Sequence, residues 1–590
     1  MGFRIFVLAS LLATSTIVHA QQNSAGDTIV VTATRSELPL SKATVPVTVI
    51  DREQIELSMA TDLAELLRFQ AGLDIGRNGG PGQATSVFMR GTESNHTLVL
   101  VDGVRINPGT IGGAALQHIQ PEVIERIEIV KGTRSALFGT DAIGGVINII
   151  TRRTTKPYAD IGLGTGSFNQ RTGHLSAGSS GDWGEFGITL NTQDTDGYAI
   201  RSGSDIERGY DNVTANVYAR RDFEFGDVTL RHWRASGNVE YLDFFLTPVD
   251  QDFLNESTAL EIGNSFGERG SSKLILSHSR DQIEQNQSVS AVESDRLSLD
   301  WQYNLAIANH QLMAGIFASD EDVDTVSTFG PGIAEGTDYR AVFLQDSFSK
   351  GRQRVFLAAR FTDYDSFGSE VTWNAEYGFD INDQWSVTAG AGHAFRAPDA
   401  TDRFGFGGNP DLAPEVADEV QLGAVYRATD RQTWRLELYS NDIKDLIEFD
   451  NATFTVQNIA EAEIRGAQLG YEYSGDSFVL KADLTTQSAD NAETNTRLLR
   501  RAEESLSISY TQRIGRHQLG VSLLTTGDRE DFAETLPSYT LVNLTGQFQL
   551  GERWQLNARI ENLFDESYET AAGFRMQELS GFAELSYRYR

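Results

Sequence analysis

Glycines and histidines are the first residues of this chain whose types and spacing could do chemistry. The run Gly162-Leu163-Gly164-Thr165-Gly166 could cradle a phosphate, but it lacks the lysine and the following helix that a phosphate-binding loop requires. The 9 histidines include no His-Glu-x-x-His zinc motif, and the chain has no Gly-x-Ser-x-Gly nucleophile elbow. Cys 0 excludes thiolate metal sites and disulfides. We therefore expect a protein that is not an enzyme and needs no cofactor for chemistry.

The start of the chain and its charge restrict where it works. Arg4, the apolar stretch Ile5–Val18 and the small residue Ala20 predict a secretory signal peptide over residues 1–20. No later run approaches the roughly 20 apolar residues of a membrane-spanning helix. A formal net charge of -33 argues against a nucleic-acid partner, which would require a basic face.

Residues 37–154 mix two kinds of pattern. Ala60–Phe69 places three leucines on one helical face, whereas Thr97–Asp102 and Ile124–Val130 are short apolar strands. Glycine-rich turns separate these elements. We predict a small α+β domain that ends in the polar, basic stretch Thr151–Pro157.

From residue 155 to residue 590 the pattern has a period of two. Apolar residues alternate with polar ones at Leu297, Leu299, Trp301, Tyr303 and Leu305, and the same alternation returns near the end of the chain. On periodicity alone, a soluble sandwich or solenoid stays open. The length of this part favours an all-β, antiparallel transmembrane barrel of about 22 strands. Such a barrel would be an open pore, so we expect the N-terminal α+β domain to plug its lumen.

Several motifs follow one another in a defined order. Residues 21–36 hold a β-prone segment that could pair as an edge strand with a partner sheet. Its residues are Asp27, Thr28, Ile29, Val30, Val31, Thr32, Ala33, Thr34 and Arg35. The further motifs are Asp102–Arg105, Ile127–Gly132, Ala142–Ile150, Phe395–Pro398 with Asn409–Glu415, and Glu561–Tyr568. In this order they resemble the TonB-dependent outer-membrane receptors, and Asp27–Arg35 resembles the TonB box of that family.

The resemblance implies a location and a set of partners. Such receptors are multi-pass proteins of the Gram-negative outer membrane, in contact with lipid and lipopolysaccharide. They obtain energy from TonB together with ExbB and ExbD, and we expect this one to be a monomer. Thr133 departs from the family pattern, which commonly carries proline after the preceding glycine. The C-terminal Arg590 also departs from it, because such barrels commonly end on an aromatic residue.

Within the family, the plug loops resemble those of the cobalamin receptors. The similar stretches are Asn78–Gln83, Arg90–His96 and Leu100–Asn107 in the plug, with Asn441–Ile447 and Leu498–Ala502 in the barrel. Carried over position by position, the resemblance implies cobalamin contacts at Ala84, Ser86, Glu93, Ile111, Gly112, Arg500 and Phe532. Small residues are suitable here because a bulky corrinoid needs a plug surface that it can approach closely.

Those receptors also order extracellular loops with calcium, a hard cation that prefers carboxylate ligands. The corresponding candidates here are Asp205, Glu207, Asp243 and Asp250. Ala199 stands where the resemblance would place an aspartate ligand, and acidic loops are also expected by chance in a chain with Asp+Glu 82.

The expected function is therefore TonB-dependent transport of cobalamin across the outer membrane. Three alternatives remain open. The same machine could carry a ferric siderophore, haem or another metal chelate. The barrel could be a non-transporting adhesin or phage receptor, and a secreted β-solenoid enzyme is the third alternative.

Overall fold

The computed structural model describes residues 28–154, 156–267, 269–327, 332–450, 453–532 and 534–589. The predicted signal peptide, Asp27 and Arg590 lie outside these residues. No helix within the described ranges is long and apolar enough to cross a membrane.

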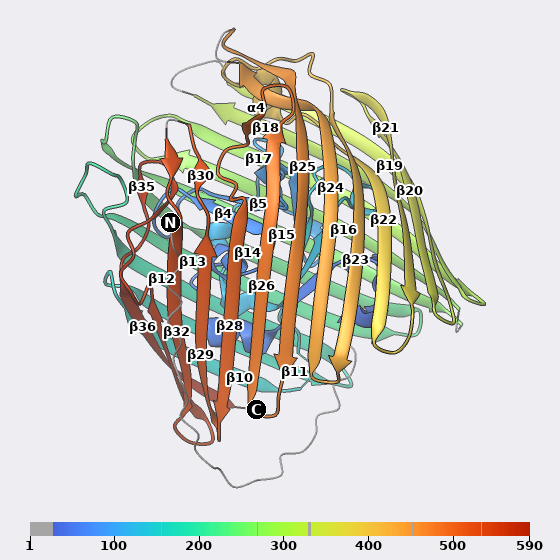
Figure 1. Cartoon of the computed structure of the whole chain (residues 1–590), viewed down its shortest axis with the longest axis horizontal. Coiled ribbons are helices and arrows are strands. Elements are labelled where there is room, and N and C mark those ends of the chain that lie inside the picture. Colours follow the sequence, from blue (N-terminus) through green and yellow to red (C-terminus); the bar gives the residue numbers. More distant parts are fainter. Residues whose placement is uncertain are drawn as a thin grey trace.

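The largest element is a closed antiparallel barrel of 22 strands (Figure 1). It closes where β36 pairs with β10, with Tyr589 opposite Ala159 and Phe582 opposite Gly166. The strands are β10 (Tyr158–Gly166), β11 (Arg171–Gly181), β12 (Gly184–Tyr198), β13 (Arg208–Phe223), β14 (Gly226–Leu242), β15 (Pro248–Phe266), β16 (Gly270–Gln285), β17 (Ala291–Ile307), β18 (His310–Val326), β19 (Ile333–Lys350), β20 (Gln353–Tyr364), β21 (Gly368–Asp380), β22 (Trp385–Arg396), β23 (Glu415–Thr429), β24 (Gln432–Asp450), β25 (Thr455–Ser474), β26 (Phe478–Asn491), β28 (Glu504–Ile514), β29 (His517–Thr526), β32 (Tyr539–Gln549), β33 (Trp554–Glu561) and β36 (Ser580–Tyr589). A two-residue strand, β27 (Thr496–Arg497), pairs with the end of β26, and β28 pairs with the rest of that strand.

Alternation along each strand separates the two faces of the barrel wall. On β19, Val342 and Leu344 are exposed, whereas Ala341 and Phe343, which alternate with them, are buried. The exposed apolar face is the one that lipid covers, and the other face lines the lumen. The predicted fold class, an antiparallel transmembrane barrel of about 22 strands with an N-terminal plug, is confirmed.

The two rims of the barrel differ. Two-residue turns such as Asp182-Trp183 join strands at one rim, whereas the other rim carries longer loops, including residues 397–414 with α4 (Ala400–Phe404). In outer-membrane barrels the short turns are periplasmic and the long loops extracellular. The extracellular rim is therefore the one at the top of Figure 1, where α4 is labelled. Four short strands pair here in two small sheets: β30 (Arg529–Glu530) with β31 (Thr535–Leu536), and β34 (Glu569–Ala571) with β35 (Phe574–Arg575).

The plug fills the lumen with a five-stranded mixed sheet in the order β3-β8-β9-β6-β7. In this sheet β6 and β9 run parallel, which a tight turn between them would not allow. The chain between them is long and includes β7 and β8. The plug elements are β1 (Ile29–Val30), β2 (Leu38–Pro39), η1 (Leu40–Lys42), β3 (Val47–Ile50), α1 (Arg52–Ser58), α2 (Leu63–Arg68), β4 (Leu73–Arg77), β5 (Thr85–Met89), η2 (Ser94–His96), β6 (Thr97–Val101), β7 (Val104–Arg105), η3 (Leu116–His118), η4 (Pro121–Val123), β8 (Ile124–Lys131), α3 (Ser135–Phe138) and β9 (Gly145–Thr151).

The predicted helix at Ala60–Phe69 is shorter in the structure. Asp62 is its N-cap, since its carboxylate accepts a hydrogen bond of 3.0 Å from the backbone N–H of Glu65, so α2 begins only at Leu63. Leu63, Leu66 and Leu67 are buried, as the amphipathic pattern predicted.

The plug core continues into the barrel wall. Ile127, Ile129 and Ile147 of the plug sheet are fully buried in a cluster that also contains Trp233 and Phe253 from the barrel strands β14 and β15. Apolar burial stabilises by about 25 cal/mol per Å². The plug therefore packs on the barrel as one core, in addition to the polar contacts described below.

Candidate functional site

A row of predicted contact residues lies on the outer part of the plug. Ser86 of β5 is paired with Gly76 of β4, and a Cβ on Gly76 would lie 3.6 Å from Cδ of Arg500. The guanidinium of Arg500 donates to Asp531 at 3.0 Å and lies 5.7 Å from the centre of the Phe532 ring. Phe532 is 83% exposed. The structure thus brings Ser86, Arg500 and Phe532 into one row, and Ala84 is exposed next to it on the same hairpin.

A second row starts at Glu93. Its carboxylate pairs with Arg501 at 2.6 Å, and the Arg501 guanidinium lies 4.2 Å from the centre of the Phe88 ring. Arg501 also donates from Nε to the carbonyl oxygen of Gly91 at 3.2 Å. The barrel loop that carries both arginines is thereby fixed to the plug beside the β4–β5 hairpin.

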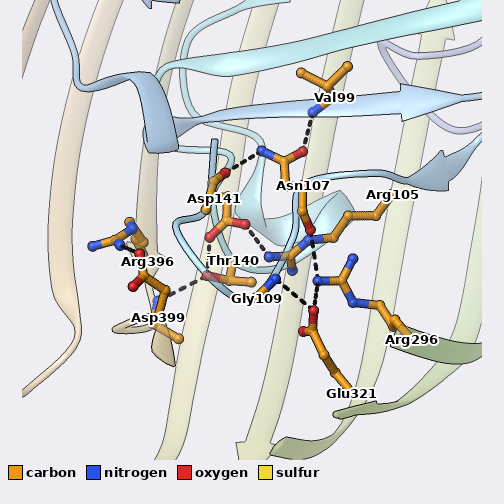
Figure 2. Close-up of polar contacts among 12 residues, drawn as sticks. Val99, Arg105, Asn107, Gly109, Thr140, Asp141, Arg296, Glu321, Arg396 and Asp399 are labelled. Atoms are coloured by element: carbon orange, nitrogen blue, oxygen red, sulfur yellow. Dashed lines mark hydrogen bonds and ion pairs between the residues drawn. The ribbon is translucent and has the colours of Figure 1, made fainter. Parts of the chain in front are cut away.

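The third predicted contact loop contains Ile111 and Gly112 and is built around Asn107, whose side chain is fully buried. The Asn107 amide donates to the carbonyl oxygen of Gly112 at 2.7 Å, and its oxygen accepts from the Val99 N–H at 2.7 Å (Figure 2). Gly112 has a φ of 68°, and a Cβ on it would lie 3.0 Å from Cβ of Asn95. Glycine is therefore required here for both the backbone and the space, while Ile111 is 58% exposed.

Charged side chains tie this loop to the barrel wall (Figure 2). Glu321 of β18 accepts from the Gly109 N–H at 2.7 Å and from Arg296 at 2.6 Å. The same Arg296 guanidinium donates to the carbonyl oxygen of Asn107 at 2.8 Å. A movement of the loop would therefore disturb an ion pair in the barrel wall.

The charged groups on the outer face of the plug are mostly neutralised by neighbours or by burial. The arginines that border the predicted contacts, Arg500 and Arg501, are each neutralised by a carboxylate. Burial raises the pKa of Asp74 on β4 to about 6, although Arg529 and a hydrogen bond from Gln487 oppose this rise. The surface thus offers apolar and backbone groups with few uncompensated charges.

The structure does not bring the four predicted calcium ligands together. Among the described residues, no group of three or more His, Cys, Asp or Glu side chains is placed to hold a metal ion. Asp243 caps its own turn by accepting from the N–H groups of Phe245 and Thr247 at 2.8 Å, and Asp250 accepts from Asn238 at 2.9 Å. Calcium binding remains a prediction.

The N-terminal segment 28–35 is held inside the barrel by one buried carboxylate. Glu128 of β8 is 0% exposed and accepts hydrogen bonds from the N–H groups of Val31 and Thr32, both at 2.9 Å, and from the Thr32 hydroxyl at 2.7 Å. Ile29 and Val30 pair with β2. The segment therefore lies in place as a short strand and turn, and Asp27 falls outside the described residues.

Arg35 fastens the other end of the segment to the barrel. Its guanidinium pairs with Asp300 of β17 and donates to the carbonyl oxygen of Leu137 at 2.8 Å. The barrel residues Gln302 and Gln345 donate to the carbonyl oxygens of Arg35 and Thr34 at 3.3 and 2.9 Å. Release of the segment would require these bonds to break.

Buried ion pairs join the plug sheet to the barrel. Arg90 pairs with Glu419 at 3.1 Å and with Glu437 at 3.0 Å, and Arg134 pairs with Glu376 at 2.6 Å. Each pair has its charges close enough to offset part of their desolvation cost.

The departure at Thr133 has a structural counterpart. Its backbone N–H donates to Glu419 at 2.5 Å, and its carbonyl oxygen accepts from Asn374 at 3.0 Å. Proline has no N–H and could not make the first of these bonds.

Sequence reasoning missed Glu128, Asp300 and the ion-paired barrel glutamates. One signal was available for Glu128, which stands between two isoleucines in a strand that is otherwise apolar at its centre. A charge at such a position needs a buried partner. One partner, Arg126, is only two residues away, but the N-terminal segment could not be read as the other, because it lies 96 residues away.

Comparisons with known proteins agree with this architecture. Residues 39–146 match the family model described as TonB-dependent Receptor Plug Domain, and residues 151–563 match that described as TonB dependent receptor-like, beta-barrel. The chain is 30% identical to the vitamin B12 transporter BtuB of Photobacterium profundum, over 97% of both chains. It is also 30% identical to the protein of the same name from Vibrio vulnificus, over 99% of this chain and 98% of the relative.

Solved structures of the same fold include two siderophore receptors. The siderophore receptor PirA from Acinetobacter baumannii has a TM-score of 0.82 at 17% identity, covering 93% of this chain and 99% of that one. The ferric enterobactin receptor PfeA from Pseudomonas aeruginosa has a TM-score of 0.82 at 16% identity, covering 95% of this chain and 100% of that one. At this level of identity, the likeness concerns the fold alone.

Proposed function

The chain belongs to the TonB-dependent receptor family of the outer membrane, and from this premise we propose that its cargo is cobalamin. The observation that carries the proposal is the 30% identity to two vitamin B12 transporters over nearly the whole chain. The proposed process is transport and breaks no covalent bond.

The chemistry of the outer plug surface supports this cargo over an anionic chelate. An acidic ferric siderophore would be bound best by uncompensated cations. Here Arg500 and Arg501 are already paired with Asp531 and Glu93. A corrinoid such as cyanocobalamin is large and carries no net charge. Exposed apolar groups such as Ile111 and Phe532, with accessible backbone, are suited to such a ligand.

Capture and release require different amounts of energy. A site with nanomolar affinity holds its cargo with about 12 kcal/mol, and the outer membrane has no nucleotide or ion gradient to release it. We propose that TonB, with ExbB and ExbD, transmits work from the inner membrane. A proton crossing there yields roughly 2.3 kcal/mol per 100 mV, so several protons per cargo are a sufficient supply. Asp27–Arg35 would pair with TonB edge to edge after leaving the barrel.

The cargo can be tested with purified protein. Calorimetry or fluorescence quenching with cyanocobalamin should give saturable binding, whereas ferric enterobactin and haem at the same concentrations should give none. An absence of cobalamin binding at micromolar ligand, or tighter binding of a ferric chelate, would refute the proposed cargo. The variant Phe532→Ala should raise the Kd for cobalamin roughly tenfold, because it removes one aromatic contact from the proposed site.

Deletion of residues 27–35 tests the dependence on TonB. We expect the deleted protein to bind cobalamin as the intact protein does, because no predicted cargo contact lies in the segment. Uptake of radiolabelled cobalamin into cells should fall to the level of a strain without TonB. Uptake that persists after the deletion would contradict the mechanism.

A further inference from the structure

Two arginines share one aromatic ring on the inner wall of the barrel. The guanidinium of Arg35, in the N-terminal segment, lies 4.6 Å from the centre of the Phe343 ring. The guanidinium of Arg360, on β20, lies 5.6 Å from the same centre. Both cations therefore occupy one small region between the plug and the strands β17–β20.

Of these two guanidinium groups, only that of Arg35 has a carboxylate partner among the described residues. Arg35 is paired with Asp300, whereas Arg360 has no carboxylate oxygen within 4.0 Å among the described residues. Arg360 is 1% exposed. Its Nε donates to the Thr362 hydroxyl at 3.1 Å, but neither Nη atom has a hydrogen-bond partner in the described part of the chain. A buried guanidinium in this condition is costly, so its presence needs an explanation.

The plug holds Arg360 in this position. A Cβ on Gly139, just after α3, would lie 3.4 Å from Nη2 of Arg360, so the backbone of the plug lies against the guanidinium. The guanidinium also lies 5.3 Å from the centre of the Phe317 ring. The rings of Phe317 and Phe343 give it weak cation–π partners in place of an acid.

Asp300 is close to this cation in the barrel wall. It stands directly opposite Phe317 in the register of β17 and β18, and the Arg360 guanidinium lies 5.3 Å from the centre of the Phe317 ring. The unpaired guanidinium and the carboxylate that Arg35 holds are thus both neighbours of the same phenylalanine. Arg35 lies nearer to the Phe343 ring than Arg360 does, at 4.6 Å against 5.6 Å from its centre.

We propose that Arg360 is a positioning residue that replaces Arg35 as the partner of Asp300 when the N-terminal segment leaves the barrel. The inference rests on the proposed role of Asp27–Arg35 as the segment that undocks. In the docked state, Asp300 neutralises Arg35, and Arg360 stays buried without an acid. When Arg35 withdraws, pairing of Arg360 with Asp300 removes the cost of two unpaired buried charges at once. The exchange lowers the free energy of the undocked state and so sets the ratio of the two states.

The ratio can be measured directly, because the chain has Cys 0 and a single introduced cysteine is therefore unique. Ile29 is half exposed, so the variant Ile29→Cys of the full-length protein can carry a spin label at this position. Electron paramagnetic resonance then separates an immobile, docked population from a mobile one. The Glu128→Gln change is added to this parent to weaken docking and bring both populations into the measurable range.

In this parent, Arg360→Met should lower the ratio of undocked to docked protein about tenfold, equivalent to about 1.4 kcal/mol. Arg360→Lys, which keeps the charge, should restore the parent ratio. In an Asp300→Asn background, Arg360→Met should change the ratio less than twofold, because the two arginines no longer compete. Arg354→Met is the matched control: this buried arginine of the same strand pairs with Asp380, so its loss should leave the ratio unchanged.

A ratio that stays constant or rises in Arg360→Met would overturn the proposal, since simple loss of packing against Gly139 loosens the plug. An equal fall with and without Asp300 would overturn it as well. Neither cobalamin nor TonB is present, so a wrong cargo assignment leaves the result intact. A label that remains immobile in every variant would contradict undocking itself, and this inference with it.

Discussion

Glu128 is the plug carboxylate that binds the N-terminal segment. One of its oxygens accepts three hydrogen bonds from Val31 and Thr32, at 2.7 to 2.9 Å. Hydrogen bonds to a charged group contribute about 1.5–3 kcal/mol each, more than bonds between neutral groups. A single buried carboxylate thus holds the segment from the plug side, while Arg35 holds it from the barrel side.

Glu128→Gln should therefore raise the undocked population. The amide keeps the shape of the side chain but removes the charge, so we expect at least a tenfold rise in the mobile fraction of a spin label at position 29. Glu125→Gln on the same strand is the control, because no bond to the segment involves Glu125. An unchanged mobile fraction in Glu128→Gln would show that the carboxylate does not hold the segment.

The backbone N–H of Thr133 leads to a second prediction at a single residue. Thr133→Pro removes the N–H that donates to Glu419 and leaves part of a buried carboxylate unsatisfied. The cost of such a group is about 1–3 kcal/mol. The variant should lower the melting temperature of the plug in detergent by several degrees. Thr133→Ala keeps the N–H and should melt as the parent does, so equal melting of both variants would contradict this account.

At the scale of elements, η3 joins the plug to two barrel strands through one histidine. His118 stacks on Phe253 of β15 with ring centres 3.6 Å apart, and its ring nitrogen lies 3.1 Å from the hydroxyl of Tyr210 on β13. Burial lowers the pKa of His118 to about 3, with a smaller contribution from Arg77. The ring is therefore neutral in the folded protein throughout the physiological range.

This shift predicts a pH dependence of stability. Because the folded pKa lies below the unfolded value of about 6.5, the unfolded chain takes up the proton first, and stability falls as the pH drops below 6.5. Between pH 7.5 and pH 5 the loss is about 2 kcal/mol. His118→Gln should abolish this part of the loss, as measured by thermal unfolding at pH 5 and pH 7.5. Equal pH dependence of the two proteins would contradict the assignment.

The elements also show what could be predicted from the sequence. The strands at Thr97–Val101 and Ile124–Lys131 were predicted to within one residue, because a short apolar run between turn residues is a local property. Contacts between plug and barrel could not be predicted in this way. The alternation of β20 places Arg360 on the inward face of the barrel wall. Whether a carboxylate lies near it depends on how the plug packs against four strands of the wall, which alternation does not tell.

The cargo contacts of the candidate site stay a prediction. The positions on the plug loops follow from motifs, and the structure places Ser86 near Arg500 and Phe532. The four acidic residues were grouped by resemblance alone, and their side chains bind their own loops where the structure shows their partners. Which carboxylates come together depends on how separate loops fold over the rim, which a local pattern does not contain.

At the scale of the whole molecule, buried ion pairs connect two bodies that are otherwise separate in the sequence. Glu376 and Glu419 of the barrel hold Arg134 and Arg90 of the plug. The barrel itself is held by its hydrogen-bonded ladder, which involves neither arginine. Loss of these pairs should therefore loosen the plug without opening the barrel.

The double variant Glu376→Gln/Glu419→Gln tests this separation. Arg134 would lose its acid inside the protein and Arg90 would keep only Glu437, and the loss of one partner typically costs about 3–5 kcal/mol for a buried pair. In planar bilayers we expect frequent current openings at urea concentrations where the parent stays closed. The heat-dependent shift in electrophoretic mobility, which reports the barrel, should be unchanged. Loss of both properties together would show that plug and barrel unfold as one unit.

The pairing of β36 with β10 also determines the order in which the molecule can be assembled. The first and last strands of the sheet are its two free edges until the end of the chain is present, so the cylinder is the last structure to form. The plug precedes every barrel strand in the chain, and its core is shared with side chains from the wall. The final hydrogen-bonded ladder, between β36 and β10, therefore encloses a domain whose core continues into the wall.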